Sequence, residues 1–210
     1  MYHSIYEKRE DYVDIFSLSL NKFRLHIRTI AKYFKVVSSE NATFKQENEV
    51  VITFDDGFKD NMTLALPILE EHQLPFSVFV ATGLLDTKGY LSTDELREFS
   101  KHPLVTIGVH GHLHEPLGKM SLEDAKADLM TSKNKLEEII GKKVTTMSFP
   151  HGSYNQELVT FLKENGFTFI STSDFGQNIE PSDKYNRLTI FDCETIYTLN
   201  QKISGKWNWM

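Results

Sequence analysis

Short apolar runs that alternate with helical segments constrain the fold of this chain more than any other feature of its sequence. Continuous runs of this kind suit strands that are buried on both faces, as in parallel sheets. The strongest runs span residues 50–54, 76–81, 105–109 and 144–149, and weaker ones span residues 167–171 and 187–191. Strands that alternate with helices predict an α/β fold with a parallel sheet.

Helix-capping residues and helix breakers lie between these runs. Ser121 is a predicted N-cap for a helix that Gly141 ends. Residues 61–72 also have a helical pattern, in which Pro67 predicts a kink. The polar motifs described below follow the ends of predicted strands. We therefore expect a closed or nearly closed barrel, because active sites of α/β barrels lie at the carboxyl ends of their strands.

The composition fits one globular domain over residues 1–210, with 40% hydrophobic residues to form a core. The formal net charge of -6 argues against a nucleic-acid partner, because proteins that bind nucleic acid usually carry a basic face. Cys193 is the only cysteine, so the chain is unable to form an internal disulfide.

The sequence predicts neither a spanning segment nor a signal peptide. No apolar run approaches the roughly 18 residues that a membrane-spanning helix needs, and the polar start at residues 1–4 lacks the shape of a signal peptide. As written, the chain is expected to be cytoplasmic. Peripheral association with a membrane, or a secreted chain trimmed of its leader, would show the same pattern. The oligomeric state stays open.

Two adjacent carboxylates follow the first predicted strand. Asp55 and Asp56 lie in the segment Thr-Phe-Asp-Asp-Gly at residues 53–57. Side chains alternate in direction along a strand, so one carboxylate is able to bind a metal while the other faces a substrate. Taken alone, a solvated acidic turn explains this segment better, because Asp-Gly is a common turn pair.

Three histidines within five residues follow the third predicted strand. His110 and His114 are four residues apart, a spacing that lets both imidazoles reach one metal. His112 lies between them, should point away from both, and is interpreted as a supporting or surface residue. Histidines at this density are rarely structural, because each one needs a partner or water.

One of the two aspartates, together with His110 and His114, supplies one carboxylate and two imidazoles, with a position left for water. This donor set is typical of a catalytic rather than a structural zinc-type site. We therefore expect one divalent metal ion, with zinc as the first choice and cobalt, nickel or manganese as alternatives. The other aspartate is a spare carboxylate that would serve as a base.

A third polar segment, residues 148–154, follows the fourth predicted strand. Its proline and glycine shape a tight loop, which is able to aim the backbone N–H of His151 at an oxyanion. A plain turn between a strand and a helix is the simpler interpretation of this segment by itself.

In this order the three segments resemble the motifs of the polysaccharide deacetylase family, carbohydrate esterase family 4. Residues 53–57 match the first motif intact, and residues 148–152 match the third only partly. Residues 110–114 match the second, with Gly111 where a hydroxyl residue usually braces the loop, so the bracing must come from elsewhere. The resemblance covers nearly the whole chain and implies a distorted (β/α) barrel with fewer than eight parallel strands.

The departures from the family pattern concern the third motif and the general acid. The family's arginine, which pairs with the base, is replaced by Ser148. We hypothesise that Arg187 reaches Asp55 instead. The family's late histidine, its general acid, is also missing, because no histidine follows His151. His151 itself, His3, or a single group that acts as both base and acid therefore remain as alternatives.

The resemblance implies Asp55 as base, and Asp56 as the metal ligand beside His110 and His114. It predicts a metal-dependent hydrolase that removes N-acetyl groups from amino sugars of a polysaccharide or its precursor. Metal-activated water would attack the acetamide while Asp55 takes its proton. The chain resembles members associated with bacterial surface-polysaccharide and exopolysaccharide synthesis, so an N-acetylated sugar or oligosaccharide is the expected partner. Tyr154, Trp207 and Trp209 are candidates to stack on sugar faces, although ordinary packing explains them at least as well.

Two other functions are compatible with the sequence. The same site would also suit an N-formyl group or another small amide. Alternatively, the chain is a scaffold or sugar-binding protein that has lost turnover, as the missing arginine and late histidine suggest. The intact Asp55, Asp56, His110 and His114 argue against this alternative, because a decaying site should lose its metal ligands first.

Overall fold

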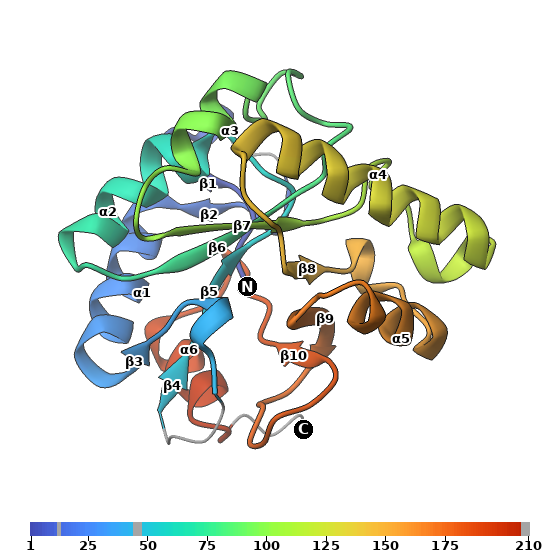
Figure 1. The fold of residues 1–210 in the computed structure, drawn as a ribbon. Coiled ribbons are helices and arrows are strands. Elements are labelled where there is room, and N and C mark those ends of the chain that lie inside the picture. The colour runs from blue at the N-terminus through green and yellow to red at the C-terminus, as the bar shows by residue number, and fades with distance from the viewer. Residues whose placement is uncertain (12–13, 44–47, 207–210) are drawn as a thin grey trace.

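The computed structural model describes residues 1–11, 14–43 and 48–206 (Figure 1). Its main sheet has six strands in the order β10-β9-β8-β7-β6-β5, and every neighbouring pair is parallel. The strands are β5 (Ile52–Phe54), β6 (Phe76–Val80), β7 (Val105–Val109), β8 (Thr146–Ser148), β9 (Phe169–Phe175) and β10 (Tyr185–Arg187). The sheet curls into a half-barrel with helices packed around its outside (Figure 1).

One helix lies between each two consecutive strands from β5 to β9, another helix precedes the sheet, and a further one follows it. The helices are α1 (Leu20–Tyr33), α2 (Leu66–Glu71), α3 (Thr93–Phe99), α4 (Leu122–Ile140), α5 (Gln156–Glu164) and α6 (Ile196–Ile203). Two short parallel pairs lie outside the main sheet: β1 (Ile5–Tyr6) with β2 (Leu18–Ser19), and β3 (Lys35–Val36) with β4 (Glu49–Val50). None of the helices in the described ranges is long and apolar enough to cross a bilayer.

The first residues of the chain lie along the open side of the half-barrel. Tyr2 forms a parallel bridge with Phe54 of β5. The N–H of Ile190, shortly after β10, donates to the carbonyl of Met1 over 3.1 Å. This segment therefore spans the gap between the two edge strands of the sheet, and it places His3 next to the end of β5.

Two apolar clusters pack against the two faces of the sheet. The larger cluster joins the sheet to the helices and includes the fully buried Phe23 and Phe76. The smaller cluster contains Phe79, Phe169 and Tyr185 and fills the concave side. Each fully buried large apolar side chain contributes roughly 1.5–3 kcal/mol. The concave side becomes polar directly beyond the smaller cluster, and this is where the candidate site lies.

The predicted strands of the main sheet are confirmed, with changes in its two edge strands, β5 and β10. The run over residues 50–54 is divided, because Val50 pairs in β4 while Ile52–Phe54 form β5. The strand predicted over residues 187–191 is wrong in position, since β10 is Tyr185–Arg187. The residues after Arg187 turn toward the N-terminal segment instead of extending β10.

The predicted helix ends are also largely confirmed. The Oγ of Ser121 accepts a hydrogen bond from the N–H of Asp124 at the start of α4, and Gly141 ends this helix with a φ of 69°. The helical segment over residues 61–72 is irregular, as expected, but its irregularity is a π-helix at Asn61–Ala65 that precedes Pro67. Pro67 itself lies in the first turn of α2, where a missing N–H costs little.

Candidate metal centre and active site

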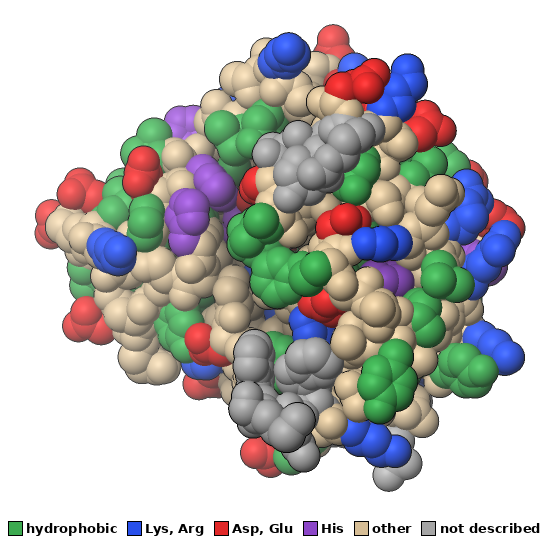
Figure 2. Space-filling model, turned by 180° about the vertical axis from the view of Figure 1, so that it is seen from behind, with side chains coloured by type: hydrophobic (Ala, Val, Ile, Leu, Met, Phe, Trp, Pro, Cys, Tyr) green, Lys and Arg blue, Asp and Glu red, His purple; other side chains and the backbone are tan. Residues whose placement is uncertain are grey.

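The polar side chains that follow the strands meet at one edge of the sheet. Asp55 and Asp56 come directly after β5, and His110 comes directly after β7. Carboxyl ends of parallel strands converge at one edge of a barrel, so residues distant in sequence become neighbours there. Figure 2 shows histidine side chains gathered on the face opposite to that seen in Figure 1, next to hydrophobic side chains.

Asp56, His110 and His114 form a candidate metal centre. One ligand atom from each residue lies within 4.8 Å of the others. The Oδ1 of Asp56 is 3.2 Å from the Nε2 of His110 and 3.0 Å from the Nε2 of His114. The Nδ1 of His110 donates to the carbonyl of Ser148 over 2.9 Å, which leaves its Nε2 free to act as a ligand. Two imidazoles and one carboxylate fit a zinc-type ion.

Backbone strain is concentrated at this centre. Asp56 and His114 have positive φ angles of 75° and 58°, and the neighbouring His151 has a φ of 55°. Residues other than glycine rarely adopt this left-handed conformation, which costs of order 1–3 kcal/mol. Strain of this kind persists where it orients functional side chains, and here it turns the Asp56 carboxylate and the His114 ring toward each other.

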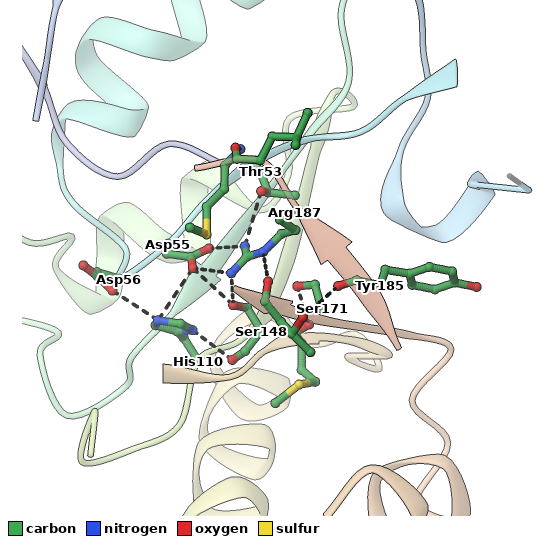
Figure 3. Close-up of polar contacts among 12 residues, drawn as sticks. Thr53, Asp55, Asp56, His110, Ser148, Ser171, Tyr185 and Arg187 are labelled. Atoms are coloured by element: carbon green, nitrogen blue, oxygen red, sulfur yellow. Dashed lines mark hydrogen bonds and ion pairs between the residues drawn. The ribbon is translucent and has the colours of Figure 1, made fainter. Parts of the chain in front are cut away.

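The Asp55 carboxylate is paired with Arg187 inside the half-barrel (Figure 3). Two nitrogens of Arg187 donate to the two oxygens of Asp55, each over 2.7 Å. Both side chains are buried. Burial alone would raise the pKa of Asp55, but the charge of Arg187 and then that of His110 outweigh it and lower this pKa to about 2. Asp55 is therefore ionised throughout the neutral range.

Arg187 is itself held by further hydrogen bonds. Its Nε donates to the carbonyl of Thr172 over 2.7 Å, and one terminal nitrogen donates to the Oγ of Ser148 over 2.6 Å. Ser148 in turn donates to Asp55 over 3.1 Å. The serine at the third-motif position thus links the arginine to the carboxylate, and the positive charge comes from β10 (Figure 3). The contact that we hypothesised for Arg187 is present in the structure, while its part in catalysis stays a prediction.

The histidine loop is braced by Asp128 of α4. The two carboxylate oxygens accept the backbone N–H groups of His112 and Leu113 over 2.7 and 2.8 Å. Gly111 has a φ of 71°, and a Cβ there would lie 2.9 Å from an Asp128 oxygen. Glycine therefore suits this position on two grounds, conformation and space. The brace that sequence analysis expected from elsewhere comes from the side of a helix.

His3 lies close to the carboxylates of the site. Its ring packs against Phe16, with 4.9 Å between ring centroids. Burial lowers the pKa of His3, whereas the nearby charges of Asp55 and Asp56 raise it in part. The Nδ1 of His3 is buried and has no hydrogen-bond partner within the described residues. Only its Nε2 is therefore available to exchange a proton with a substrate.

The remaining predicted residues lie around this centre. His151 is exposed and packs against His114, and its Nε2 lies 3.0 Å from the His114 carbonyl. His112 contacts the Oγ1 of Thr82 over 2.9 Å and is not part of the Asp56–His110–His114 group.

Among the aromatic candidates for sugar stacking, Tyr154 stacks on Phe149, with 5.1 Å between ring centroids. Two further candidates, Trp207 and Trp209, lie outside the described residues.

Sequence reasoning missed Asp128 and also Asp60 and Asn61, which bond to the N-terminal segment. Asp128 is the only acidic residue on the buried side of the predicted helix over residues 122–140. An acidic residue on an apolar helix face is visible in the sequence and could have indicated a functional role. Asp60 and Asn61 look like ordinary polar residues at the start of a helix, so nothing in their local pattern distinguishes them.

A half-barrel of parallel strands with aspartate and histidine side chains at its carboxyl edge defines a (β/α)-barrel protein with a candidate metal centre. The family model described as polysaccharide deacetylase matches residues 43–170. This chain belongs to the polysaccharide deacetylase family.

Two curated relatives are similar to this chain over part of their length. A putative polysaccharide deacetylase of Bacillus subtilis, YxkH, is 26% identical over 130 residues, which cover 62% of this chain and 46% of that protein. The poly-β-1,6-N-acetyl-D-glucosamine N-deacetylase of Staphylococcus aureus (strain MRSA252) is 25% identical over 136 residues, which cover 59% of this chain and 47% of that protein. The chain thus spans just under half the length of these relatives.

Two solved structures share the fold over almost the whole chain. A polysaccharide deacetylase from Bacillus cereus has a TM-score of 0.82 and 24% identity, and the match covers 96% of this chain and 67% of that one. IcaB from Ammonifex degensii has a TM-score of 0.83 and 19% identity, and the match covers 97% of this chain and 93% of that one. These likenesses show that the distorted barrel expected from the sequence is correct.

Proposed function

We propose that this chain is a metal-dependent hydrolase that removes N-acetyl groups from the amino sugars of a polysaccharide or its precursor. The observation that carries the proposal is a buried, ionised Asp55 paired with Arg187 directly beside an Asp-His-His centre. Membership of the family supports deacetylation. The Staphylococcus aureus relative is a poly-β-1,6-N-acetyl-D-glucosamine N-deacetylase, which supports an N-acetylglucosamine polymer as the first substrate to test.

Asp56, His110 and His114 would hold one divalent ion, for which zinc is our first choice. Such an ion, when bound, supplies a water molecule of lowered pKa and polarises a carbonyl group. The chain contributes the geometry: the hydrogen bond from His110 to the Ser148 carbonyl fixes the ring, and the Asp128 brace fixes the loop that carries His114.

Asp55 is the proposed base. Arg187 keeps its carboxylate ionised near neutral pH, so the carboxylate is ready to accept a proton from an attacking water. One Asp55 oxygen lies 3.9 Å from the Nε2 of His110, which places the base next to the metal centre. The backbone N–H of His151, in the turn after β8, is the proposed donor to the oxyanion.

His3 is our choice for the general acid. Deacetylation requires that the sugar nitrogen receive a proton before it leaves as an amine. His3 is half-buried near both carboxylates, and its Nδ1 is buried without a partner in the described residues, which leaves Nε2 as the ring nitrogen to exchange a proton. His151 is less suitable, because it is exposed and its Nε2 contacts the carbonyl of His114. Nothing in this assignment needs a histidine after residue 151.

The test is release of acetate from N-acetylglucosamine oligomers, including β-1,6-linked ones, and from nucleotide- or lipid-linked N-acetyl sugars. The samples are the zinc-loaded protein, a chelated sample and Asp55→Asn, whose metal content is measured in parallel. We expect release by the loaded protein, loss on chelation, and loss in Asp55→Asn with the metal retained, by about 100-fold or more. N-formyl sugars serve as a second panel. No release from any substrate by protein with metal bound would contradict the proposal.

A further inference from the structure

The N-terminal segment is tied to the loop that follows the two catalytic-site aspartates. Asp60 accepts hydrogen bonds from the hydroxyl of Ser4 over 2.7 Å and from the N–H of Ile5 over 2.9 Å. The Nδ2 of Asn61 donates to the carbonyl of His3 over 2.8 Å and to Asp60 over 2.9 Å. Every residue from 3 to 5 is thus bound by one of these two side chains.

Asp60, which is half-buried, and Asn61 add their hydrogen bonds to the pairing of β1 with β2, which also holds this segment. Asn61 is fully buried, and burial raises the pKa of Asp60 to about 6, because little water reaches its carboxylate. Asp60 is the N-cap and Asn61 the first residue of the π-helix, which follows the turn after the Asp55–Asp56 pair. Residues 55–61 therefore contain Asp55 and Asp56 and also form the hydrogen bonds to the segment that contains His3.

The position of the His3 imidazole costs free energy, because one of its nitrogens is buried without a hydrogen bond in the described residues. This nitrogen is Nδ1. A buried polar atom without a hydrogen bond costs about 1–3 kcal/mol, and an unrestrained N-terminal segment would lower that cost by moving the ring into water. The bridge of Tyr2 to β5 and the pairing of β1 with β2 hold this segment, and the hydrogen bonds of Asp60 and Asn61 restrain residues 3–5 in addition.

We propose that Asp60 and Asn61 are positioning residues, which fix the backbone of residues 3–5 so that His3 stays beside Asp55 and Asp56. The proposal rests on the proposed function, in which His3 protonates the leaving amine. It assigns no chemistry to Asp60 or Asn61 themselves. Their effect on turnover must therefore pass through His3, and this makes the proposal testable.

The structure offers a destructive variant, a conservative variant and a control. Asp60→Ala removes both acceptors, whereas the amide oxygen of Asp60→Asn is still able to accept from Ile5 while its NH2 donates to the Ser4 hydroxyl. Asn61→Ala removes the bond to His3. The control is Asp86→Ala, because Asp86 also accepts two hydrogen bonds, both from Thr93, but does not touch residues 3–5.

Two substrates separate proton donation from the rest of the reaction. An N-acetyl sugar must receive a proton on nitrogen as the C–N bond breaks, whereas a nitrophenyl acetate loses a stable phenolate that needs no proton. We expect Asp60→Ala and Asn61→Ala to lower turnover of the amide by about 10- to 100-fold and turnover of the ester by less than about 3-fold. Asp60→Asn should restore most of the amide turnover, and Asp86→Ala should match the wild type.

A double-mutant comparison and hydrogen exchange complete the test. Adding Asp60→Ala to His3→Ala should cause no further loss of amide turnover, because both changes remove one function. By NMR, the Ile5 amide should exchange at least about 10-fold faster in Asp60→Ala than in the wild type or Asp86→Ala, whether or not metal is bound. Thermal melting confirms that each variant is folded.

The outcomes are distinct. A wild-type protein that cleaves neither substrate would refute the proposed function and, with it, the catalytic purpose of this restraint. A wild-type protein that is active, with equal losses on both substrates or additive losses in the double variant, would refute the positioning role alone. Unchanged exchange of the Ile5 amide in Asp60→Ala would also refute it.

Discussion

Replacing Arg187 by methionine is the sharpest test of the electrostatics of the site. Methionine keeps much of the volume of the side chain but removes its charge and all of its donors. Asp55 would then be a buried carboxylate that has lost both of its 2.7 Å charge-assisted hydrogen bonds. Breaking a buried ion pair by removing one partner costs about 3–5 kcal/mol, because the other charge is left uncompensated. We expect the free energy of unfolding at pH 7 to fall by about this amount.

The loss in the free energy of unfolding should be larger at neutral pH than at acidic pH. In the wild type the pKa of Asp55 is lowered from 3.8 to about 2, so its stabilising contribution is complete above pH 3.8 and disappears as the pH falls toward 2. Without Arg187, burial should instead raise this pKa above 3.8. The unfavourable contribution is then largest at neutral pH and is relieved on acidification. The stability difference between the two proteins should therefore shrink by about 2 kcal/mol between pH 7 and pH 4.

The assay is urea unfolding of chelated protein at pH 4, 5, 6 and 7, combined with the pH profile of kcat/KM for the zinc-loaded protein. The raised pKa of Asp55 should move the acid limb of the variant's profile to higher pH. Lys202→Met is the matched control, because Lys202 is also a buried cation paired with a carboxylate, Glu194, but it does not contact Asp55. This control should lose stability without moving the acid limb of the profile.

Two results would refute the reasoning. An Arg187→Met variant whose turnover is unimpaired would show that the ion pair does not tune the base. A stability loss of the same size at pH 4 and pH 7 would show that methionine disturbs packing and that the charge of Asp55 is not involved.

Further predictions concern the brace of the histidine loop. Gly111→Ser restores the hydroxyl residue that is usual in the family. We expect it to destabilise the protein by about 1–3 kcal/mol in urea unfolding, because the φ of 71° and the nearby Asp128 oxygen exclude a Cβ. A variant as stable as the wild type would contradict this. Asp128→Asn leaves only one oxygen for the two amides of the loop, and we expect zinc affinity to fall by about 10-fold or more in a competition titration. Asp124→Asn, on the same helix but bonded to Ser121, is the control and should bind zinc like the wild type.

The main sheet was predictable because its strands are buried on both faces. Continuous runs such as residues 76–81 and 105–109 carry that burial in their composition, and the structure confirms them as β6 and β7. Strands at the edge of the sheet carry a weaker signal. β10 is only three residues long and contains the charged Arg187, so its position depends on the tertiary contact with Asp55 and not on local pattern.

Two short helices were not predicted, one of them although its sequence contains a local signal. Helix α3, at Thr93–Phe99, has a capping box formed by Ser92 and Glu95, which is a local signal that the sequence does contain. Helix α6, at Ile196–Ile203, is only eight residues long. Helices of this length are marginal in isolation, and packing against the rest of the protein decides whether they form.

The candidate site was predictable where its residues are adjacent in sequence and unpredictable where they are brought together by the fold. Asp55 with Asp56, and His110 with His114, lie in compact segments whose composition alone indicates chemistry. The Asp128 brace and the hydrogen bonds of Asp60 to residues 4 and 5 connect segments 15 to 56 residues apart. A local pattern is able to mark Asp128 as an acidic residue on a buried helix face, but it does not record which distant segment such a residue contacts.

The departures from the family motifs share one physical explanation. The positive charge absent at position 148 is supplied by Arg187 from the next-but-one strand of the sheet, and the hydroxyl absent at position 111 is replaced by Asp128 from a helix. Arg187 reaches this edge from the end of β10, because the carboxyl ends of parallel strands converge there, and Asp128 reaches it from the first half of α4. A site that had lost its function would have no reason to keep a buried Asp55, which would cost several kcal/mol without a counter-charge. Its retention together with a relocated arginine supports a base that is still in use.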